Sequence, residues 1–235
     1  MTSVDELGAI LPYLPKDKRI ISVTEVGSGM WGMRELSSDY DIVVIYSDNM
    51  VDFMAGKGYT PNLPCKHGIM IEGKEYDFAY MEVGHLINLL KKGNINAIWA
   101  TLSPIVITTS ALHKEIAAYI QKHPTQSIMP SLGGMVVSQL SDVVKRAGVR
   151  DPKKNIMTAM RTVQFGLNLV RTNQYAFTPI SRTCNEEDVR QSLSNLNFII
   201  KSSDMCDKIP AVGLEEILLK HRMQFLKEDF ERREK

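Results

Sequence analysis

The chain has 235 residues, a hydrophobic content of 44%, a charged content of 23% and a formal net charge of +1. These values are typical of a globular protein, and the length allows one large domain or two small ones. The near-neutral charge excludes a general field that would hold nucleic acid or an anionic membrane, so such binding would need a local patch.

The first hundred residues alternate short apolar runs with turn residues. Runs rich in branched or aromatic side chains predict strands: residues 19–26, 41–46, 68–72 and 74–80. The last two of these runs, hinged at Gly73, are expected to form a hairpin. Residues 55–66 contain glycines and prolines and predict a loop. The leucine spacing over residues 82–92 predicts a helix that ends before Gly93.

After Pro104 the pattern becomes helical. Apolar residues recur at about helical spacing in five segments, which predicts helices over residues 111–123, 131–147, 154–172, 186–202 and 212–233. The whole chain therefore predicts an α/β (α+β) fold. We expect a domain with a mixed β-sheet and flanking helices over residues 1–108, followed by an all-helical domain over residues 109–235.

Two aspartates, Asp39 and Asp41, flank Tyr40 at the start of the second predicted strand. Alternate side chains of an extended strand share a face, so both carboxylates are expected to point the same way. Two carboxylates this close repel each other unless a divalent cation lies between them, and Mg²⁺ (or Mn²⁺) prefers such oxygen ligands. An isolated pair of this kind is more often a surface turn with two solvated aspartates.

A small-residue turn, Gly27-Ser28-Gly29, follows the first predicted strand directly. Glycine allows close backbone approach, and the Ser28 hydroxyl with the following amides offers donors for phosphate oxygens. The alternative is a strand-to-helix turn that merely needs glycine. Because Ser28 and Asp39 are only eleven residues apart on successive elements, their combination favours a phosphate site beside a metal site.

A third carboxylate would complete a two-metal site. Asp77 lies in a strand-like run between aromatic residues, where an acid is costly unless it is paired or bound to a metal. Glu75 shares its face by the period-two rule and is the competing candidate, and either acid could instead pair with Lys74. We favour Asp77. The histidines, among them His67, have no ligand-like spacing and are expected to be structural or surface residues.

The segment from Gly27-Ser28 to Ser38-Asp39-Tyr40-Asp41 resembles the signature of the DNA polymerase β-type nucleotidyltransferase superfamily. Further segments resemble a prokaryotic and phage branch of that superfamily associated with RNA repair: residues 76–78, 86–97, 102–106 and 154–172. The similarity covers roughly residues 20–180. The chain has Gly29 where the branch often has arginine, and Ile98 where it tends to have an acidic residue.

The resemblance implies transfer of a nucleotidyl group with two metal ions. Asp39 and Asp41 would hold the nucleotide-bound Mg²⁺ and help to hold the second ion. Asp77 would ligate that second ion and aid deprotonation of an attacking hydroxyl. Gly27 and Ser28 would bind the leaving pyrophosphate. The catalytic and metal-binding residues implied are therefore the three aspartates.

Basic residues gather between residues 143 and 185: Lys145, Arg146, Arg150, Lys153, Lys154, Arg161, Arg171 and Arg182. Lys154 and Arg161 are seven residues apart and are expected on one helix face, where one or both would meet the triphosphate of a nucleotide. The other basic residues of the region 145–182 could follow an RNA backbone. A solvated basic face would produce the same pattern.

The leading hypothesis is a metal-dependent nucleotidyltransferase that transfers an NMP from an NTP to an acceptor hydroxyl, with an RNA end as the expected acceptor and pyrophosphate as the product. One alternative is AMP transfer to a protein or a small molecule. Another is a catalytically silent nucleotide-binding module. Retention of three aspartates argues against the silent module, because an unused acid cluster is costly.

The cellular location of the protein is predicted from the targeting and membrane signals that the sequence lacks. The N-terminus has neither the basic start nor the apolar core of a secretory signal, and no apolar stretch approaches the roughly 18–20 residues of a membrane span. The three cysteines, Cys65, Cys184 and Cys206, form no CxxC pair. We therefore expect a reduced, cytoplasmic protein without membrane contact.

Overall fold

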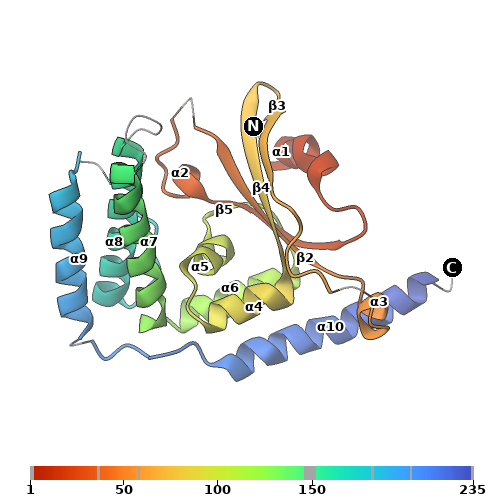
Figure 1. The fold of residues 1–235 in the computed structure, drawn as a ribbon. Helices are drawn as coiled ribbons and strands as arrows, with labels where there is room; N and C mark the ends of the chain where they lie inside the picture. Colours follow the sequence, from red (N-terminus) through yellow and green to blue (C-terminus); the bar gives the residue numbers. More distant parts are fainter. Residues whose placement is uncertain are drawn as a thin grey trace.

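The computed structural model describes residues 3–35, 38–57, 59–145, 152–180, 183–201 and 203–233. Five strands form one sheet in the order β3-β4-β2-β1-β5 (Figure 1). The strands are β1 (Arg19–Glu25), β2 (Tyr40–Ser47), β3 (Lys66–Ile71), β4 (Lys74–Glu82) and β5 (Ile105–Thr109). β2 and β4 are parallel, and the other neighbours are antiparallel. This mixed sheet with many helices confirms the α/β fold expected from the sequence.

The helices that surround the sheet are α1 (Ser3–Ile10), α2 (Gly27–Met30), α3 (Met50–Met54), α4 (Val83–Lys91), α5 (Ile95–Leu102), α6 (Ala111–Lys122), α7 (Met129–Lys145), α8 (Pro152–Thr172), α9 (Glu186–Ile200) and α10 (Ala211–Arg233). Helices α7, α8 and α9 pack side by side (Figure 1). Helix α10 runs along one edge of the molecule and contacts α3, α4 and α6. None of the described helices is both long and apolar enough to cross a membrane.

Over the described part of the chain, the predicted strands and the five predicted C-terminal helices are confirmed to within a few residues. Residues 146, 147 and 202, which two of these predictions included, lie outside it. Strand β5 and the short helices α1, α2, α3 and α5 were not predicted. Helix α5 is apolar on nearly every side, so it lacks the stripe that identifies a surface helix. It begins instead at a capping residue, Asn94, whose side chain accepts a hydrogen bond from the Ala97 amide at 3.0 Å.

The sheet separates two layers of buried apolar residues. One face carries alternate residues of β2, including Ile42 and Val44, and is covered by α1. The opposite face packs against the helices through Ile45 of β2 and Ile21 of β1. This second cluster is continuous from β1 to α10, so it contains residues from both sides of position 108. The division into domains at that position stays a prediction.

Candidate active site

The parallel pairing of β2 and β4 brings two predicted site residues together. Asp41 and Asp77 are register partners, so their side chains leave adjacent strands on the same face of the sheet. Asp39 lies two residues before Asp41, at the entrance to β2. One carboxylate oxygen from each of the three aspartates lies within 4.8 Å of the others, and all three side chains are partly buried. Glu75, the competing candidate, is exposed and outside this cluster.

The two neighbouring carboxylates act on Asp41. Burial, followed by the charges of Asp39 and Asp77, raises the pKa of Asp41 from its usual value to about 6. Lys154, at the start of α8, acts in the opposite direction. Its ammonium lies 3.5 Å from Asp39 Oδ1, and its side chain is 69% exposed. The cluster therefore has an excess of negative charge that one exposed lysine only partly offsets.

A β-bulge in β3 orients the third aspartate. The register between β3 and β4 shifts between Lys66 and Ile69. At this shift Gly68 has a φ of +65°. Its amide donates to Asp77 Oδ1 at 2.8 Å, and His67 Nδ1 donates to Asp77 Oδ2 at 3.0 Å. Partial burial acts to raise the pKa of Asp77, but these hydrogen bonds outweigh it and hold the pKa below its usual value. The bulge thus keeps Asp77 ionised and fixes its orientation.

The glycine turn lies directly against the acid cluster. Gly27 has a φ of +66°, and a Cβ at this position would overlap Asp41 Oδ2, so a larger residue would strain the backbone and displace the Asp41 carboxylate. The neighbouring Val26 amide donates to the Asp41 carbonyl at 2.8 Å. Within the described part of the chain, the Ser28 side chain has no hydrogen-bond partner and is only partly buried. The turn therefore places a free hydroxyl and the backbone of Gly27 close to the carboxylates.

An ion pair that the sequence did not indicate supports the loop between the turn and Asp39. Arg34 pairs with Glu25, which is 1% exposed at the end of β1. The Arg34 guanidinium also lies 3.8 Å from the centre of the Tyr40 ring. A Cβ at Gly29 would collide with Glu25 Oε1, so this glycine makes room for the pair. These contacts hold the loop against the residue between the two metal-binding candidates.

Arg161 differs from Lys154 in its surroundings. It is 8% exposed, and burial lowers the pKa of its guanidinium. Its Nε donates to the Met157 carbonyl at 3.2 Å and its Nη2 to Thr158 Oγ1 at 3.0 Å. No described carboxylate forms an ion pair with it. The structure therefore brings Lys154, but not Arg161, into contact with the acid cluster, and it leaves a buried cation without a protein counter-ion among the described residues.

The structure describes only some of the other residues of the predicted basic region. Lys145 ends α7, and Lys153 and Arg171 lie in α8. The remaining predicted members, Arg146, Arg150 and Arg182, lie outside the described residues.

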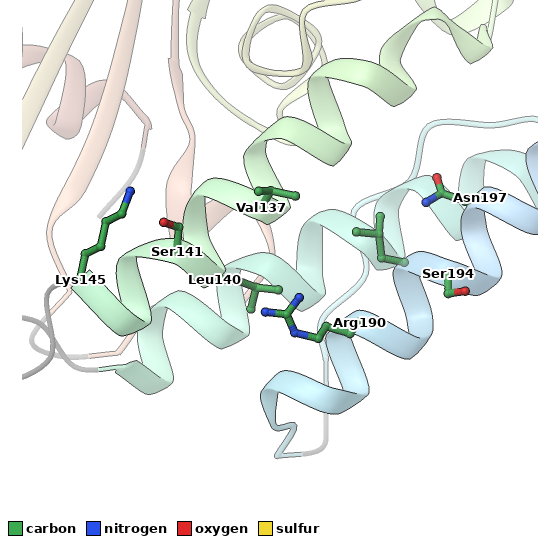
Figure 2. A pocket seen from close by; sticks show the side chains of 8 residues that line it. Val137, Leu140, Ser141, Lys145, Arg190, Ser194 and Asn197 are labelled. Atoms are coloured by element: carbon green, nitrogen blue, oxygen red, sulfur yellow. The ribbon is translucent and has the colours of Figure 1, made fainter.

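A cavity of about 570 Å³ lies between α7 and α9 (Figure 2). It is lined by Val137, Leu140, Ser141, Lys145, Arg190, Leu193, Ser194 and Asn197. The cavity contains none of the three aspartates, so it is distinct from the acid cluster. Two of its lining residues, Lys145 and Arg190, are basic.

A family model described as the RNA repair pathway DNA polymerase beta family matches residues 11–235. The chain belongs to this family. The match confirms the resemblance seen in the sequence and supports a transferase of the nucleotidyltransferase class. Nucleotidyltransferases of this family generally use a divalent metal, which agrees with the presence of the carboxylate cluster.

A solved structure is also similar to this chain. The crystal structure of a nucleotidyltransferase-like protein from Exiguobacterium sibiricum is similar over 98% of this chain and 78% of that chain, with 10% sequence identity and a TM-score of 0.38. Comparison with curated proteins gives no match.

Proposed function

We propose that the protein transfers an NMP from an NTP to an acceptor hydroxyl, with release of pyrophosphate, and that the acceptor is an RNA end. The observation that carries the proposal is the cluster formed by Asp39, Asp41 and Asp77 against the turn at Gly27. Family membership supports the reaction class, and the family's description supports RNA as the acceptor.

The donor set fits divalent cations. All three side chains offer carboxylate oxygens, the ligands that Mg²⁺ and Mn²⁺ prefer. The pKa of Asp41 is raised by burial and then by repulsion from Asp39 and Asp77, and a bound cation would relieve that repulsion. Asp39 and Asp41 would hold the ion that accompanies the nucleotide, and Asp41 with Asp77 would hold a second. Bound cations would stabilise the charge on the attacking and leaving oxygens.

The protein's own groups would bind and orient the substrates. Gly27 leaves room for the Asp41 carboxylate beside the turn, and the backbone of Gly27 and Ser28 with the Ser28 hydroxyl would bind the leaving pyrophosphate. Lys154 and Arg161 would offset the charge of the triphosphate, Lys154 from the surface and Arg161 from its buried position in α8. Asp77, held ionised by His67 and Gly68, would accept a hydrogen bond from the attacking hydroxyl.

The cavity between α7 and α9 is a candidate path for the acceptor. Its basic residues, Lys145 and Arg190, suit a phosphate backbone, although Arg190 also pairs with Glu186. The apolar Leu140 and Leu193 offer a surface for a sugar or a base. Figure 2 shows Leu140 and Lys145 on α7 and Arg190 on α9, the two helices that border the cavity. This arrangement supports an extended acceptor better than a small molecule.

Labelled NTPs test the proposal. The full chain is incubated with Mg²⁺ or Mn²⁺, each labelled NTP in turn, and RNA with a free 3′ hydroxyl. The same RNA with a blocked 3′ end, DNA of the same sequence and a protein mixture serve as competing acceptors. We expect label on the unblocked RNA and none with the Asp41→Asn variant. The exposed Asp204→Asn variant should remain active, because this residue lies outside the cluster.

Other outcomes would contradict the proposal in distinct ways. Label on protein would replace the RNA acceptor with AMP transfer to a polypeptide. Label on RNA that is insensitive to Asp41→Asn would remove the acid cluster from the reaction. No transfer under any condition would leave a nucleotide-binding module. Cytoplasmic location stays a prediction.

A further inference from the structure

Helix α10 carries an apolar stripe on its solvent side. Val212, Leu219, Met223 and Phe230 are 65%, 63%, 61% and 51% exposed. Counted from Val212, the others follow after 7, 11 and 18 residues. At about 100° per residue, these spacings place all four side chains within an arc of roughly 40°. The four side chains therefore share one face along most of the helix, unlike the scattered apolar residues of an ordinary protein surface.

The opposite face of α10 is fixed to the rest of the molecule. Leu214, Phe225 and Asp229 are buried there. Ion pairs join α10 to distant elements: Lys91–Glu215, Lys220–Glu115, Arg222–Glu82 and Arg19–Asp229. Figure 1 shows the helix along the outer edge, with α4 and α6 on its inner side. These contacts fix the orientation of α10, so its apolar stripe stays on the solvent side.

The order of residues in the stripe is symmetric. Val212 and Phe230 lie nine residues before and after His221, whose side chain is buried on the inner face. Leu219 and Met223 lie two residues before and after the same position. Suppose that a second copy of α10 packs antiparallel against the stripe, with the two-fold axis at the level of His221. Val212 would then lie against Phe230 of the second copy. The same packing would also place Leu219 against Met223 of the second copy, so the smallest side chain meets the largest and the two of similar volume meet each other.

Charges beside the stripe have the same symmetry. Glu216 and Lys227 lie five residues before and six residues after His221, and both fall on the same flank of the stripe. Both are exposed, and neither forms an ion pair with any described residue. In an antiparallel two-fold pair, identical flanks face each other. Glu216 would therefore lie within about one residue's rise of Lys227 of the second copy, and this contact would occur twice.

We propose that α10 is a homodimer interface, in which two copies of the chain pair antiparallel through Val212, Leu219, Met223 and Phe230. The contact consists of one helix face from each copy, so we expect a dimer that dissociates on dilution rather than a permanent one. The self-complementary charges favour a second copy over an unrelated partner helix. The proposal does not depend on the reaction proposed above.

Sedimentation velocity over a wide range of concentrations tests the interface. We expect the full chain to shift from monomer to dimer as its concentration rises. Leu219→Glu should raise the dissociation constant at least ~10-fold, because it buries a charge in the centre of the stripe. The matched control is Phe198→Glu on α9, which removes an apolar side chain that is 78% exposed but lies outside the stripe. The control should dimerise like the wild type.

Charge reversal tests the antiparallel arrangement itself. In Glu216→Lys, a lysine faces Lys227 of the second copy at both of these contacts. In Lys227→Glu, a glutamate faces Glu216 of the second copy. Each change should weaken the dimer about 10-fold. The double variant should restore wild-type dissociation. A wild type that stays monomeric at every concentration overturns the proposal, as does a dimer that tolerates Leu219→Glu. Failure of the double variant to recover overturns the antiparallel pairing. Circular dichroism of each variant distinguishes these results from unfolding.

Discussion

Asp41 and Asp77 are register partners on parallel strands although 36 residues separate them in the chain. Adjacent strands lie about 4.8 Å apart, so the pairing forces two like charges to this spacing on one face of the sheet. The pKa of Asp41 is raised to about 6 by burial and by the neighbouring carboxylates. In the metal-free protein, the fold therefore keeps carboxylates in unfavourable electrostatic repulsion at the place where cations would bind.

Asp41→Asn should stabilise the metal-free protein and abolish its response to metal. A raised carboxyl pKa means that ionised Asp41 destabilises the folded state above about pH 6. Near pH 7.5 the neutral amide should therefore increase the free energy of unfolding by up to roughly 3 kcal/mol. Mg²⁺ should raise the melting temperature of the wild type but not of the variant. Thermal unfolding with and without Mg²⁺ measures both effects.

The exposed Asp204→Asn variant is the matched control for this measurement. It removes the same charge outside the cluster and should change neither stability nor the Mg²⁺ response. A metal-free Asp41→Asn protein that is less stable than the wild type would show that Asp41 has a structural role that outweighs its repulsion.

Much of the fold was predictable because its elements differ in local pattern. The strands around Ile42 and Val44 have dense branched residues, and the C-terminal helices have clear apolar periodicity. Strand β5 was missed although its five residues are all β-branched and favour a strand. The run is short and lies directly after Pro104, where the chain was interpreted as becoming helical.

The acid cluster was predictable for a different reason. Asp39 and Asp41 share a face by strand geometry alone, and Asp77 was favoured over Glu75 for its place between aromatic residues of a strand and partly for the resemblance. The contribution of His67 was not predictable, because it depends on a bulge that aims its ring at Asp77 across the hairpin. The Gly68 that forms the bulge was the only local signal, and a glycine within a strand equally often marks a tight bend or the close approach of another backbone.

Gly27→Ala should remove metal binding. The substitution places a Cβ in the space of Asp41 Oδ2 and also strains a backbone with φ of +66°. We expect a loss of about 1–3 kcal/mol of stability from strain and no Mg²⁺-dependent stabilisation. Gly56→Ala is the matched control, since Gly56 has a φ of +70° but nothing within 4 Å of an added Cβ. Gly56→Ala should lower the melting temperature because of backbone strain, but Mg²⁺ should still stabilise this variant. Thermal unfolding with and without Mg²⁺ measures both effects.

His67→Ala should weaken metal binding without unfolding the protein. His67 is largely exposed, so little packing is lost, but Asp77 loses one of the two hydrogen bonds that hold its pKa below the usual value. Loss of a residue that orients a ligand typically lowers metal affinity by about 10–100-fold. Mn²⁺ titration by calorimetry measures the change. His85→Ala, in α4 at the far end of β4, should bind Mn²⁺ like the wild type.

His113 should make stability depend on pH. Burial lowers the pKa of its imidazole from 6.5 to about 4, so between these values the unfolded chain binds a proton that the folded protein does not. The stability from neutral His113 is complete above about pH 6.5 and is lost as the pH falls toward 4, by about 3 kcal/mol in total. His113→Gln should lose less stability than the wild type over this range. Urea unfolding at about pH 7 and about pH 4.5 measures the difference.

Arg161→Met should weaken nucleotide binding without lowering the stability of the protein. The guanidinium is 8% exposed and no described carboxylate pairs with it, so its burial is costly in the absence of an anion. Methionine has a similar volume, and the free energy of unfolding should stay within about 1 kcal/mol of the wild type or rise. If the triphosphate supplies the missing anion, NTP affinity should fall roughly 10–100-fold.

Arg171→Met is the control for this last change, because it makes the same substitution in the same helix at an exposed position. Calorimetric titration with an NTP and Mg²⁺ should show wild-type affinity for this variant. Equal affinity in Arg161→Met would contradict a role for Arg161 at the triphosphate. A large loss of stability in Arg161→Met would instead show that the hydrogen bonds to Met157 and Thr158 already offset its burial. A buried arginine that no described carboxylate neutralises is otherwise difficult to reconcile with a protein that has no anionic substrate.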